Sequence, residues 1–422
     1  MNKAKQQVRE FLKSYCYRFF LIPKDWCKQK RLIWSLRKKK HASLAFLVSS
    51  LTMWRSQTLY DRLVIDDRFS LQIILFPFVS LSPAQRESSM QQLRDYFTEC
   101  CIPFIDLSKE VNPGHTLRER VNPDIVFYPQ PYHALYGNDL DAPSFEDKLL
   151  CYIPYAMLTS SEPWAYHCHF NNIAWRLFFQ SESQKKEAAS VLYNRGHNIR
   201  VVGETMSDLF SLPASKDVWK PQEKPKKRVI WAPHFTLTDD NFLHRNSFTW
   251  LSEFMLDVAE RYQDTIQFAF KPHPRLFTVL QELPDWGEER TSSYYARWAE
   301  GANTQLETGS YIDLFKFSDA MIHDSSSFTV EYHFTGKPVL FTATDLTPVT
   351  SILNDFGKAA VYAHYQAKNT EGILAFLENV VLGGNDPMKE QRLAFYNQYL
   401  LPPGGKSVAE NIYQEIVDSI WG

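Results

Sequence analysis

The chain has 422 residues, of which 44% are hydrophobic and 15% aromatic, a length and composition that predict two domains with separate cores. It contains no run of about 18 apolar residues, so no membrane-spanning helix is expected, and its charged start lacks the features of a signal peptide. The six cysteines form no CxxC pair and no second cluster with metal spacing, which argues against a zinc site or a disulfide framework and favours a reducing, cytoplasmic compartment.

The first 40 residues are strongly basic although the whole chain has a formal charge of -2. Thirteen Lys and Arg stand here against two carboxylates, Glu10 and Asp25, and aromatic residues alternate with the basic ones. This pattern predicts that residues 1–40 form a basic amphipathic segment that holds the protein, as a peripheral protein, on an anionic membrane at its cytoplasmic face. A helix docked on the protein body with a solvated basic face is the alternative. Nucleic acid is not expected as a partner, because the acidic remainder of the chain continues no basic track.

Residues 41–211 alternate apolar strands with helices, which predicts a parallel sheet covered on both faces. In such a sheet ligands bind beyond the carboxyl ends of the strands, where three segments draw attention: Ser49–Arg55, Pro129–Tyr136 and Ile153–Met157. An amphipathic helix is expected over Ile173–Asn194. The expected strands are Ser43–Val48, Leu71–Phe76, Phe104–Leu107, Asp124–Tyr128, Cys151–Ile153 and Ile199–Val202.

Residues 212–227 are rich in Pro, Lys and Ser and are expected to be a linker to a second αβ domain over residues 228–385. Helices are expected to follow over residues 386–422. The second domain has three polar strand ends, which should meet at one edge of its sheet: Pro233-His234, Lys271–Pro274 and His323–Ser327.

The chemistry of these strand ends suits a phosphate group. Lys271 and Arg275 are cations, His273 is a donor beside two prolines, and Ser325 to Ser327 offer hydroxyl and N–H donors at an expected helix start. Together they suit a pyrophosphate or phosphodiester that becomes a leaving group. Glu331, about one turn into the helix, could accept hydrogen bonds from sugar hydroxyls. The alternatives are polar turns and a Ser N-cap with a capping-box carboxylate.

Three stretches of this domain resemble the CDP-glycerol glycerophosphotransferases, which build teichoic acid and related capsule polymers in bacteria. They are KPHP at Lys271–Pro274, SYIDLFKF at Ser310–Phe317 and the segment Ser318–Phe341, and the resemblance covers roughly Arg228–Phe341. It implies an α/β fold of the GT-B type: two Rossmann-like parallel-sheet domains that face a central cleft, with a basic N-terminal helical extension. The C-terminal helices are expected to brace the two domains.

The resemblance also implies roles for individual residues. His273 and Arg275 come near the donor phosphates, as do Asp324, Ser325 and Ser326 at the helix start. Glu331 stands where related nucleotide-sugar enzymes hold the ribose, and His234 replaces the family's usual threonine after Ala-Pro. The full set of residues expected to bind the CDP-linked donor is His234, Lys271, Asp324, Ser325, Ser326, Ser327 and Glu331.

The general base does not carry over, because CYIPYAM stands where the family has a strand that ends in Trp-His-Gly-Thr. His133, His167 and His169 are the candidates by chain position, since a transfer to a hydroxyl needs a group that takes its proton. His167 and His169 form an HxH pair without a third metal ligand, and the second domain has no Asp-x-Asp motif. We therefore expect neither a metal nor an obligatory cofactor.

Three functions remain open from the sequence. The first is transfer of glycerol phosphate, or a similar polyol phosphate, from a CDP donor to a polysaccharide or lipid-linked acceptor. The second is a GT-B sugar transfer from a CMP-sugar such as sialic acid or Kdo in capsule or lipopolysaccharide synthesis. The third is a non-catalytic polymer-binding scaffold.

Overall fold

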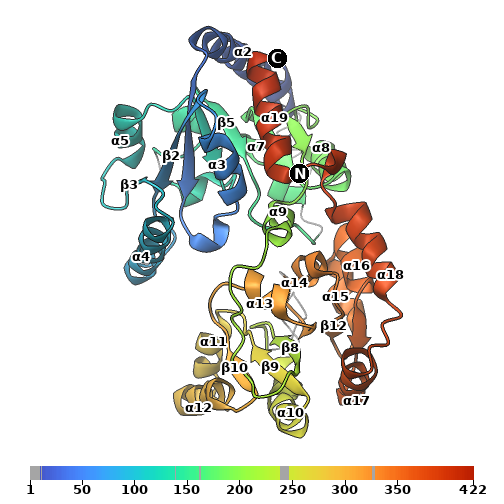
Figure 1. Cartoon of the computed structure of the whole chain (residues 1–422). Coiled ribbons are helices and arrows are strands. Elements are labelled where there is room, and N and C mark those ends of the chain that lie inside the picture. The colour runs from blue at the N-terminus through green and yellow to red at the C-terminus, as the bar shows by residue number, and fades with distance from the viewer. Residues whose placement is uncertain (1–9, 11, 138, 161–162, 238–246, 326–327) are drawn as a thin grey trace, which may run out of the picture. The chain divides into compact units, whose positions relative to one another are not determined.

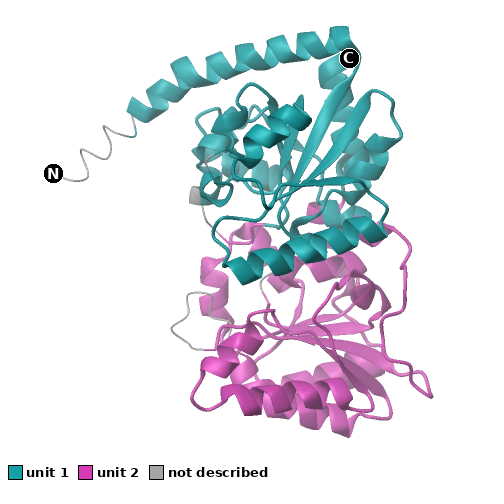
Figure 2. Ribbon diagram, turned by 90° about the vertical axis from the view of Figure 1, so that its left-hand side faces the viewer, with its two compact units in different colours: residues 1–157, 162–208, 402–422 teal, residues 158–161, 209–401 magenta. Residues whose placement is uncertain are grey.

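The computed structural model describes residues 10, 12–137, 139–160, 163–237, 247–325 and 328–422. The chain divides into two compact units, shown in different colours in Figure 2. Unit 1 comprises residues 1–157, 162–208 and 402–422, and unit 2 comprises residues 158–161 and 209–401. The sequence places the end of the first domain at residue 211, the start of the second at residue 228 and the start of the C-terminal helices at residue 386. In the structure, the long segment of unit 2 begins at Leu209, and the chain returns to unit 1 at Pro402.

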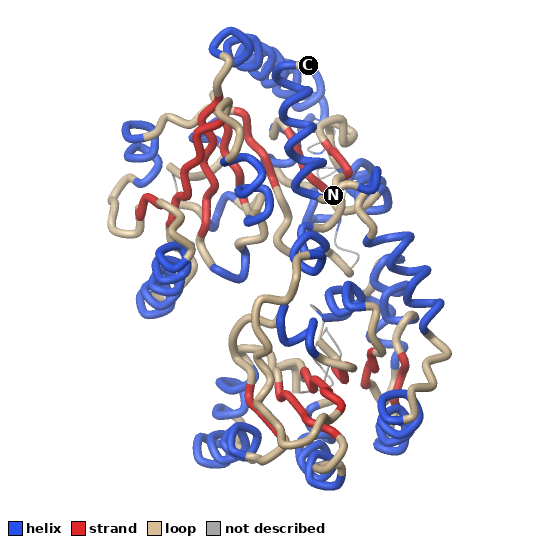
Figure 3. Tube along the Cα trace, in the orientation of Figure 1, coloured by secondary structure: helices blue, strands red, loops and turns tan. Residues whose placement is uncertain are grey.

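Unit 1 is built on a seven-stranded sheet in the order β3-β2-β1-β4-β5-β6-β7, and its paired strands are parallel. The central strands are buried runs of apolar residues, as expected where helices cover both faces of a sheet (Figure 3). The strands are β1 (Ala42–Val48), β2 (Phe69–Leu75), β3 (Phe104–Asp106), β4 (Ile125–Tyr128), β5 (Leu149–Tyr152), β6 (Arg176–Phe179) and β7 (Ile199–Val201). The α-helices are α2 (Ile22–Lys39), α3 (Gln57–Val64), α4 (Pro83–Glu99), α5 (Pro113–Arg120), α6 (Pro163–Tyr166), α7 (His169–Ile173), α8 (Glu182–Val191), α9 (Thr205–Ser211) and α19 (Val408–Trp421) (Figure 1).

The expected helix over Ile173–Asn194 is wrong, because this segment contains a strand. The segment from Arg176 to Phe179, with three apolar residues after the arginine, pairs with β5 and β7 as β6. Only after it does Ser181 accept a hydrogen bond from the Gln184 N–H and begin α8. A segment of four residues has the length of a short strand and of one helical turn alike, and the neighbouring strands decide between them.

The C-terminal helix α19 is fixed to unit 1 by a carboxylate. Asp208 accepts hydrogen bonds from the backbone N–H groups of Val408 and Ala409, each at 2.8 Å, and so satisfies the first turn of α19. Nearby, Gly203 has φ +98°, and a Cβ there would lie 2.9 Å from the Pro402 Cβ. This position therefore requires glycine where the chain returns to unit 1.

Helix α2 and the helical turns that precede it belong to unit 1 and leave a row of apolar side chains in solvent. Its Arg37 donates to the carbonyl oxygens of Ile420 and Gly422 at the end of α19. Among the described helices, none is long and apolar enough to cross a membrane. The exposed aromatic face, as we call it, consists of Leu12, Tyr15, Phe19, Phe20, Trp26 and Trp34, each 48–62% exposed.

Unit 2 contains a six-stranded sheet in the order β10-β9-β8-β11-β12-β13, again with parallel pairs. The strands are β8 (Lys227–Ala232), β9 (Ile266–Phe270), β10 (Thr304–Leu306), β11 (Ala320–His323), β12 (Val339–Thr342) and β13 (Tyr365–Ala367). The α-helices are α10 (Phe248–Arg261), α11 (Leu276–Glu282), α12 (Gly287–Glu300), α13 (Ile312–Phe317), α14 (Phe328–Glu331), α15 (Leu346–Ile352), α16 (Asp355–Tyr362), α17 (Thr370–Ala375) and α18 (Lys389–Phe395).

Two stacked histidines in the core of unit 2 predict that acid destabilises it. The rings of His333 and His364 lie 4.7 Å apart, and burial lowers the pKa of His333 to about 3 and that of His364 well below its usual value. The unfolded chain binds protons to both below about pH 6.5, whereas the folded chain does not. The free energy of unfolding should therefore fall by about 2 kcal/mol per histidine between pH 7.5 and pH 5.

Denaturant unfolding at the two pH values measures this loss. His333→Gln removes one titrating ring and keeps a donor for the Ala360 carbonyl oxygen, which the His333 Nε2 contacts at 3.2 Å. The variant should show a shallower dependence on pH. An unchanged dependence would mean that His333 is not responsible.

Candidate active site

Unit 2 has its topological switch point between β8 and β11. The chain builds the sheet outward from β8 through β9 to β10, then crosses to the other side of β8 with β11. At such a point two loops leave the carboxyl edge in opposite directions and open a crevice for ligands. The three polar strand ends, Pro233-His234, Lys271–Pro274 and His323-Asp324, therefore belong to one edge, as the sequence predicts.

Asp324 organises this edge from the inside. Its side chain accepts hydrogen bonds from the backbone N–H groups of His234 (2.7 Å) and Ser247 (3.0 Å) and from the Ser247 hydroxyl (2.6 Å). The residue is only 1% exposed. It thus fixes the loop after β8 to the end of β11, and these contacts define it as a positioning residue.

The loop after β9 presents His273 as a neutral donor. Its backbone N–H donates to the Pro233 carbonyl oxygen at 3.0 Å, and its Nδ1 accepts from the Arg275 N–H at 3.1 Å. Burial, and secondarily the charges of Arg275 and Lys271, lower the pKa of His273 to about 4. At neutral pH the ring proton therefore resides on Nε2, which can donate to a ligand.

Arg275 supplies the exposed cation of the edge. Its guanidinium lies 4.4 Å from the centre of the Phe235 ring, which itself contacts His273 at 4.5 Å between ring centres. The ring holds the guanidinium beside His273 and leaves it accessible. A cation and a neutral N–H donor side by side suit the oxygens of a phosphate group.

Lys271 and His234 are turned inward. Lys271 is 5% exposed, and its Nζ donates to the Gly309 carbonyl oxygen at 2.9 Å. Burial lowers its pKa, and Glu307 opposes this shift. His234 is 2% exposed, with its Nδ1 3.1 Å from the Thr236 hydroxyl. The first contact orders the loop after β9, on which His273 and Arg275 lie, and the second orders the loop after β8.

The helix after β11 is short. Ser325 is buried, and its carbonyl oxygen accepts from the Thr329 hydroxyl at 2.8 Å. Glu331, 6% exposed, ends the four-residue helix α14. Ser326 and Ser327, also expected to bind the donor, lie outside the described residues.

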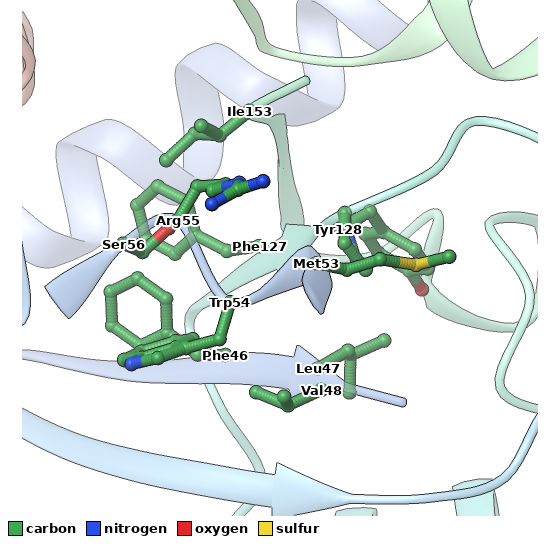
Figure 4. A pocket seen from close by; sticks show the side chains of 11 residues that line it. Phe46, Leu47, Val48, Met53, Trp54, Arg55, Ser56, Phe127, Tyr128 and Ile153 are labelled. Atoms are coloured by element: carbon green, nitrogen blue, oxygen red, sulfur yellow. The ribbon is translucent and has the colours of Figure 1, made fainter. Parts of the chain in front are cut away.

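Unit 1 has a pocket at its own switch point, between β1 and β4 (Figure 4). It is lined by the ends of these strands and by residues of all three segments that the sequence singled out, among them Arg55, Pro129 and Ile153. Figure 4 shows the Arg55 guanidinium among Ile153, Phe127 and Tyr128. Among the residues that line this pocket none is a histidine or a carboxylate.

The three candidate bases lie in different surroundings. His133 follows the carboxyl end of β4 by five residues; its side chain is 64% exposed and its Nδ1 is paired with Asp141, whose side chain is 3% exposed. Ser144 donates to Asp141 from its N–H (3.1 Å) and its hydroxyl (2.6 Å). A buried carboxylate thus orients an exposed imidazole and leaves Nε2 toward solvent.

His167 and His169 instead use both ring nitrogens within the protein. His167 contacts the Val191 carbonyl oxygen (2.7 Å) and the Tyr193 hydroxyl (3.2 Å). His169 contacts the Tyr17 hydroxyl (2.8 Å) and, at 3.6 Å, Glu146. Glu146 and Tyr193 precede β5 and β7, so these contacts lie on the amino-terminal side of the sheet. Among the three histidines, only His133 belongs to the edge where ligands bind.

Sequence reasoning missed two residues that shape the site, Asp141 and Phe235. Asp141 stands eight residues after His133 with no regular spacing, and Phe235 looks like an ordinary apolar residue beside His234. No group of His, Cys, Asp and Glu in the described part of the chain is arranged to hold a metal ion.

Comparison with known proteins supports the expected family. Residues 220–417 match the model of the family described as CDP-Glycerol:Poly(glycerophosphate) glycerophosphotransferase. No curated protein sequence matches the chain.

Similar solved structures include a variant of the wall teichoic acid polymerase TagF, with a TM-score of 0.59 at 11% identity over 99% of both chains. A second structure of that variant, soaked with CDPG, has a TM-score of 0.58 at 12% identity over 98% of both chains. A UDP-GlcNAc 2-epimerase from Neisseria meningitidis gives 0.57 at 14% identity, over 89% of this chain and 99% of that one. The expected α/β fold with two Rossmann-like domains of the GT-B type is therefore confirmed.

Proposed function

We propose that this chain, whose residues 220–417 belong to the CDP-glycerol:poly(glycerophosphate) glycerophosphotransferase family, moves glycerol phosphate or a similar polyol phosphate from a CDP-linked donor to a hydroxyl of a growing cell-surface polymer. The observation that carries the proposal is the pairing of neutral His273 with exposed Arg275 at the switch point of unit 2. This pair matches the charge that a departing nucleotide phosphate develops.

In the proposed reaction the acceptor oxygen attacks the phosphorus that carries the glycerol. The new bond joins this phosphorus to the acceptor oxygen, and the bond to the bridging oxygen breaks, so that CMP leaves with that oxygen. Arg275 neutralises the charge that grows on the leaving phosphate, and His273 Nε2 donates a hydrogen bond to it. We assign Ser325 to the donor phosphates and Glu331 to the ribose of the donor, on the strength of their position after β11.

His133 is our choice for the general base. The acceptor hydroxyl loses its proton as it attacks, and Nε2 of His133 receives it while Asp141 holds the Nδ1–H. His167 and His169 are proposed to have structural roles, because their nitrogens are occupied by Val191, Tyr193 and Tyr17.

The function is tested with the purified full chain and a panel of donors. CDP-glycerol, CDP-ribitol, CMP-sialic acid, CMP-Kdo and UDP-sugars are each incubated with and without a poly(glycerol phosphate) acceptor, and nucleotide release is measured. Acceptor-dependent CMP release from a CDP-polyol is expected. Release from a CMP-sugar alone would point to a sugar transferase, and neither turnover nor binding of any cytidine nucleotide would leave a non-catalytic scaffold.

We also propose that the exposed aromatic face holds the protein on the cytoplasmic surface of an anionic membrane. Lys30 and Lys38 lie 3.5 and 3.4 Å from the ring centres of Trp26 and Trp34, so cations and indoles alternate along this face. Such a face suits the boundary between headgroups and acyl chains.

Replacing Phe19 and Trp34 together with Ser should weaken binding to anionic vesicles by about 100-fold, because two large apolar side chains can no longer enter the membrane. Cosedimentation measures the binding. The matched control is Val111→Ser, which removes an apolar side chain 91% exposed elsewhere in unit 1 and should change nothing. Equal binding by the parent protein, the double variant and Val111→Ser would contradict the proposed role of the exposed aromatic face in membrane binding.

A further inference from the structure

A second cavity of unit 1 lies beneath helix α2. One wall is a single face of α2, and the other is formed by the segment from α7 into β6 and the turn before β7. Its volume is about 270 Å³, and it is partly open to solvent, so it has room for a ligand the size of a lipid headgroup. Because Arg176 begins β6 and Asn198 precedes β7, the cavity belongs to the amino-terminal side of the sheet, opposite the edge that carries His133.

One wall of the cavity is basic. Arg176 Nε and Arg200 Nε both donate to the same oxygen of Glu415, at 2.6 and 2.9 Å, so two guanidinium groups share one carboxylate. Burial, and secondarily the charge of Arg200, lower the pKa of Arg176. A second anion near Arg176 and Arg200 would reduce the repulsion between their two guanidinium groups. Arg200 has a side chain 35% exposed, which leaves it accessible from the cavity.

The α2 wall offers acceptors and an aromatic ring. Asp25 lies 3.8 Å from Lys28, and burial, followed by the charge of Glu146, raises its pKa. Gln29 donates its amide N–H to the Ile173 carbonyl oxygen at 2.8 Å. The Asp25 carboxyl and the Gln29 carbonyl oxygen can accept from hydroxyl groups. Trp26 lines the cavity and is also part of the exposed aromatic face, so the two adjoin.

We propose that this cavity receives the headgroup of an anionic phospholipid that carries hydroxyl groups, such as phosphatidylglycerol. The phosphodiester contacts Arg200 and Arg176. The headgroup hydroxyls donate hydrogen bonds to Asp25 and Gln29, and Trp26 contacts the start of the acyl chains. The inference rests on the proposed membrane association and adds selectivity for one headgroup chemistry to it. A lipid is favoured over a soluble polyol phosphate because the cavity adjoins the exposed aromatic face.

The test compares vesicles that carry equal amounts of phosphatidylglycerol or phosphatidylserine, which have the same net charge. The full chain should bind the phosphatidylglycerol vesicles about tenfold more tightly, which corresponds to one charge-assisted hydrogen bond. Arg200→Gln should abolish this preference, and so should Asp25→Asn. The matched control is Arg31→Gln, which removes an exposed charge from α2 outside the cavity; it should weaken both bindings equally and keep the preference.

Three outcomes would overturn the proposal: no preference in the full chain, a preference that survives Arg200→Gln, or a preference lost equally in Arg31→Gln. Asp25→Asn, which should also abolish the preference, serves as the second variant should Arg200→Gln lower the melting temperature. If the protein bound no vesicles, the proposed membrane association would be rejected. Calorimetry with soluble glycerophosphoglycerol would still measure whether the cavity binds the headgroup. Equal competition by inorganic phosphate, or tighter binding of soluble poly(glycerol phosphate), would assign the cavity to those ligands and not to a lipid.

Discussion

Arg275→Ala should lower kcat/KM for CMP release by about 100- to 1,000-fold, the usual cost of removing one donor to a developing oxyanion. The guanidinium lies on the exposed edge, 4.4 Å from the Phe235 ring, and in the proposed reaction it stabilises charge that forms only as the nucleotide phosphate departs. Arg275→Lys keeps the charge but loses the planar fork that fits two phosphate oxygens, so it should recover activity only in part. Steady-state rates with a CDP-polyol measure both variants.

Arg290 provides a matched control for this experiment. It is an arginine of the same unit whose guanidinium also lies over an aromatic ring, 4.5 Å from the centre of Trp286, but on helix α12 and not at the strand ends. Arg290→Ala should leave turnover unchanged, and the melting temperatures of both alanine variants should stay close to that of the parent protein. Equal turnover by Arg275→Ala and the parent would remove Arg275 from the phosphate site.

His133→Ala should lower kcat by about 100- to 10,000-fold, the range that general base catalysis contributes. The exposed ring is oriented by Asp141, whose side chain is 3% exposed, and in the proposed reaction its other nitrogen takes the proton of the acceptor hydroxyl. The loss should appear in kcat and not in KM for the donor, because His133 does not contact the nucleotide in this proposal. The acidic limb of the pH–rate profile should also disappear.

Asp141→Asn tests whether the carboxylate acts through His133. An asparagine can still accept from Ser144 through its oxygen, but its amide then donates to Nδ1 and shifts the ring proton to Nε2, where a base needs a lone pair. Activity should fall nearly as far as in His133→Ala. His115, which pairs with Glu119 at 3.2 Å with both side chains 67% exposed, provides a matched control: His115→Ala should change neither rate nor profile. A pH–rate profile that keeps its acidic limb in His133→Ala would assign the proton transfer elsewhere.

The division of the chain into two parallel-sheet units could be predicted because it rests on local signals. Buried strands are short apolar runs, and the carboxyl ends of parallel strands share an edge, so HDSS, KPHPR and the end of VIWAPH could be placed together from chain order alone. Strand β6 could not be predicted in this way, because the segment from Arg176 to Phe179 is too short for its hydrophobic period to distinguish a strand from a helix.

Which polar groups of the edge face a ligand was decided only by the tertiary structure. The sequence predicts that Lys271, Arg275 and Asp324 all contact the donor, but contacts with distant residues separate them. The Gly309 carbonyl oxygen binds Lys271, and the N–H groups of His234 and Ser247 bind Asp324, so that both are turned inward. Arg275 remains exposed over its aromatic ring.

The same reason separates the three candidate bases. Chain position alone does not distinguish His133, His167 and His169. Partners up to 152 residues away occupy the nitrogens of His167 and His169, whereas Asp141 orients the His133 ring toward solvent. The sequence by itself determined the fold class, the two units and the polar loop proposed to bind phosphate, because residues adjacent in the chain encode them. The tertiary structure decided which side chains are available for chemistry, because burial and hydrogen bonding join segments that no local pattern relates.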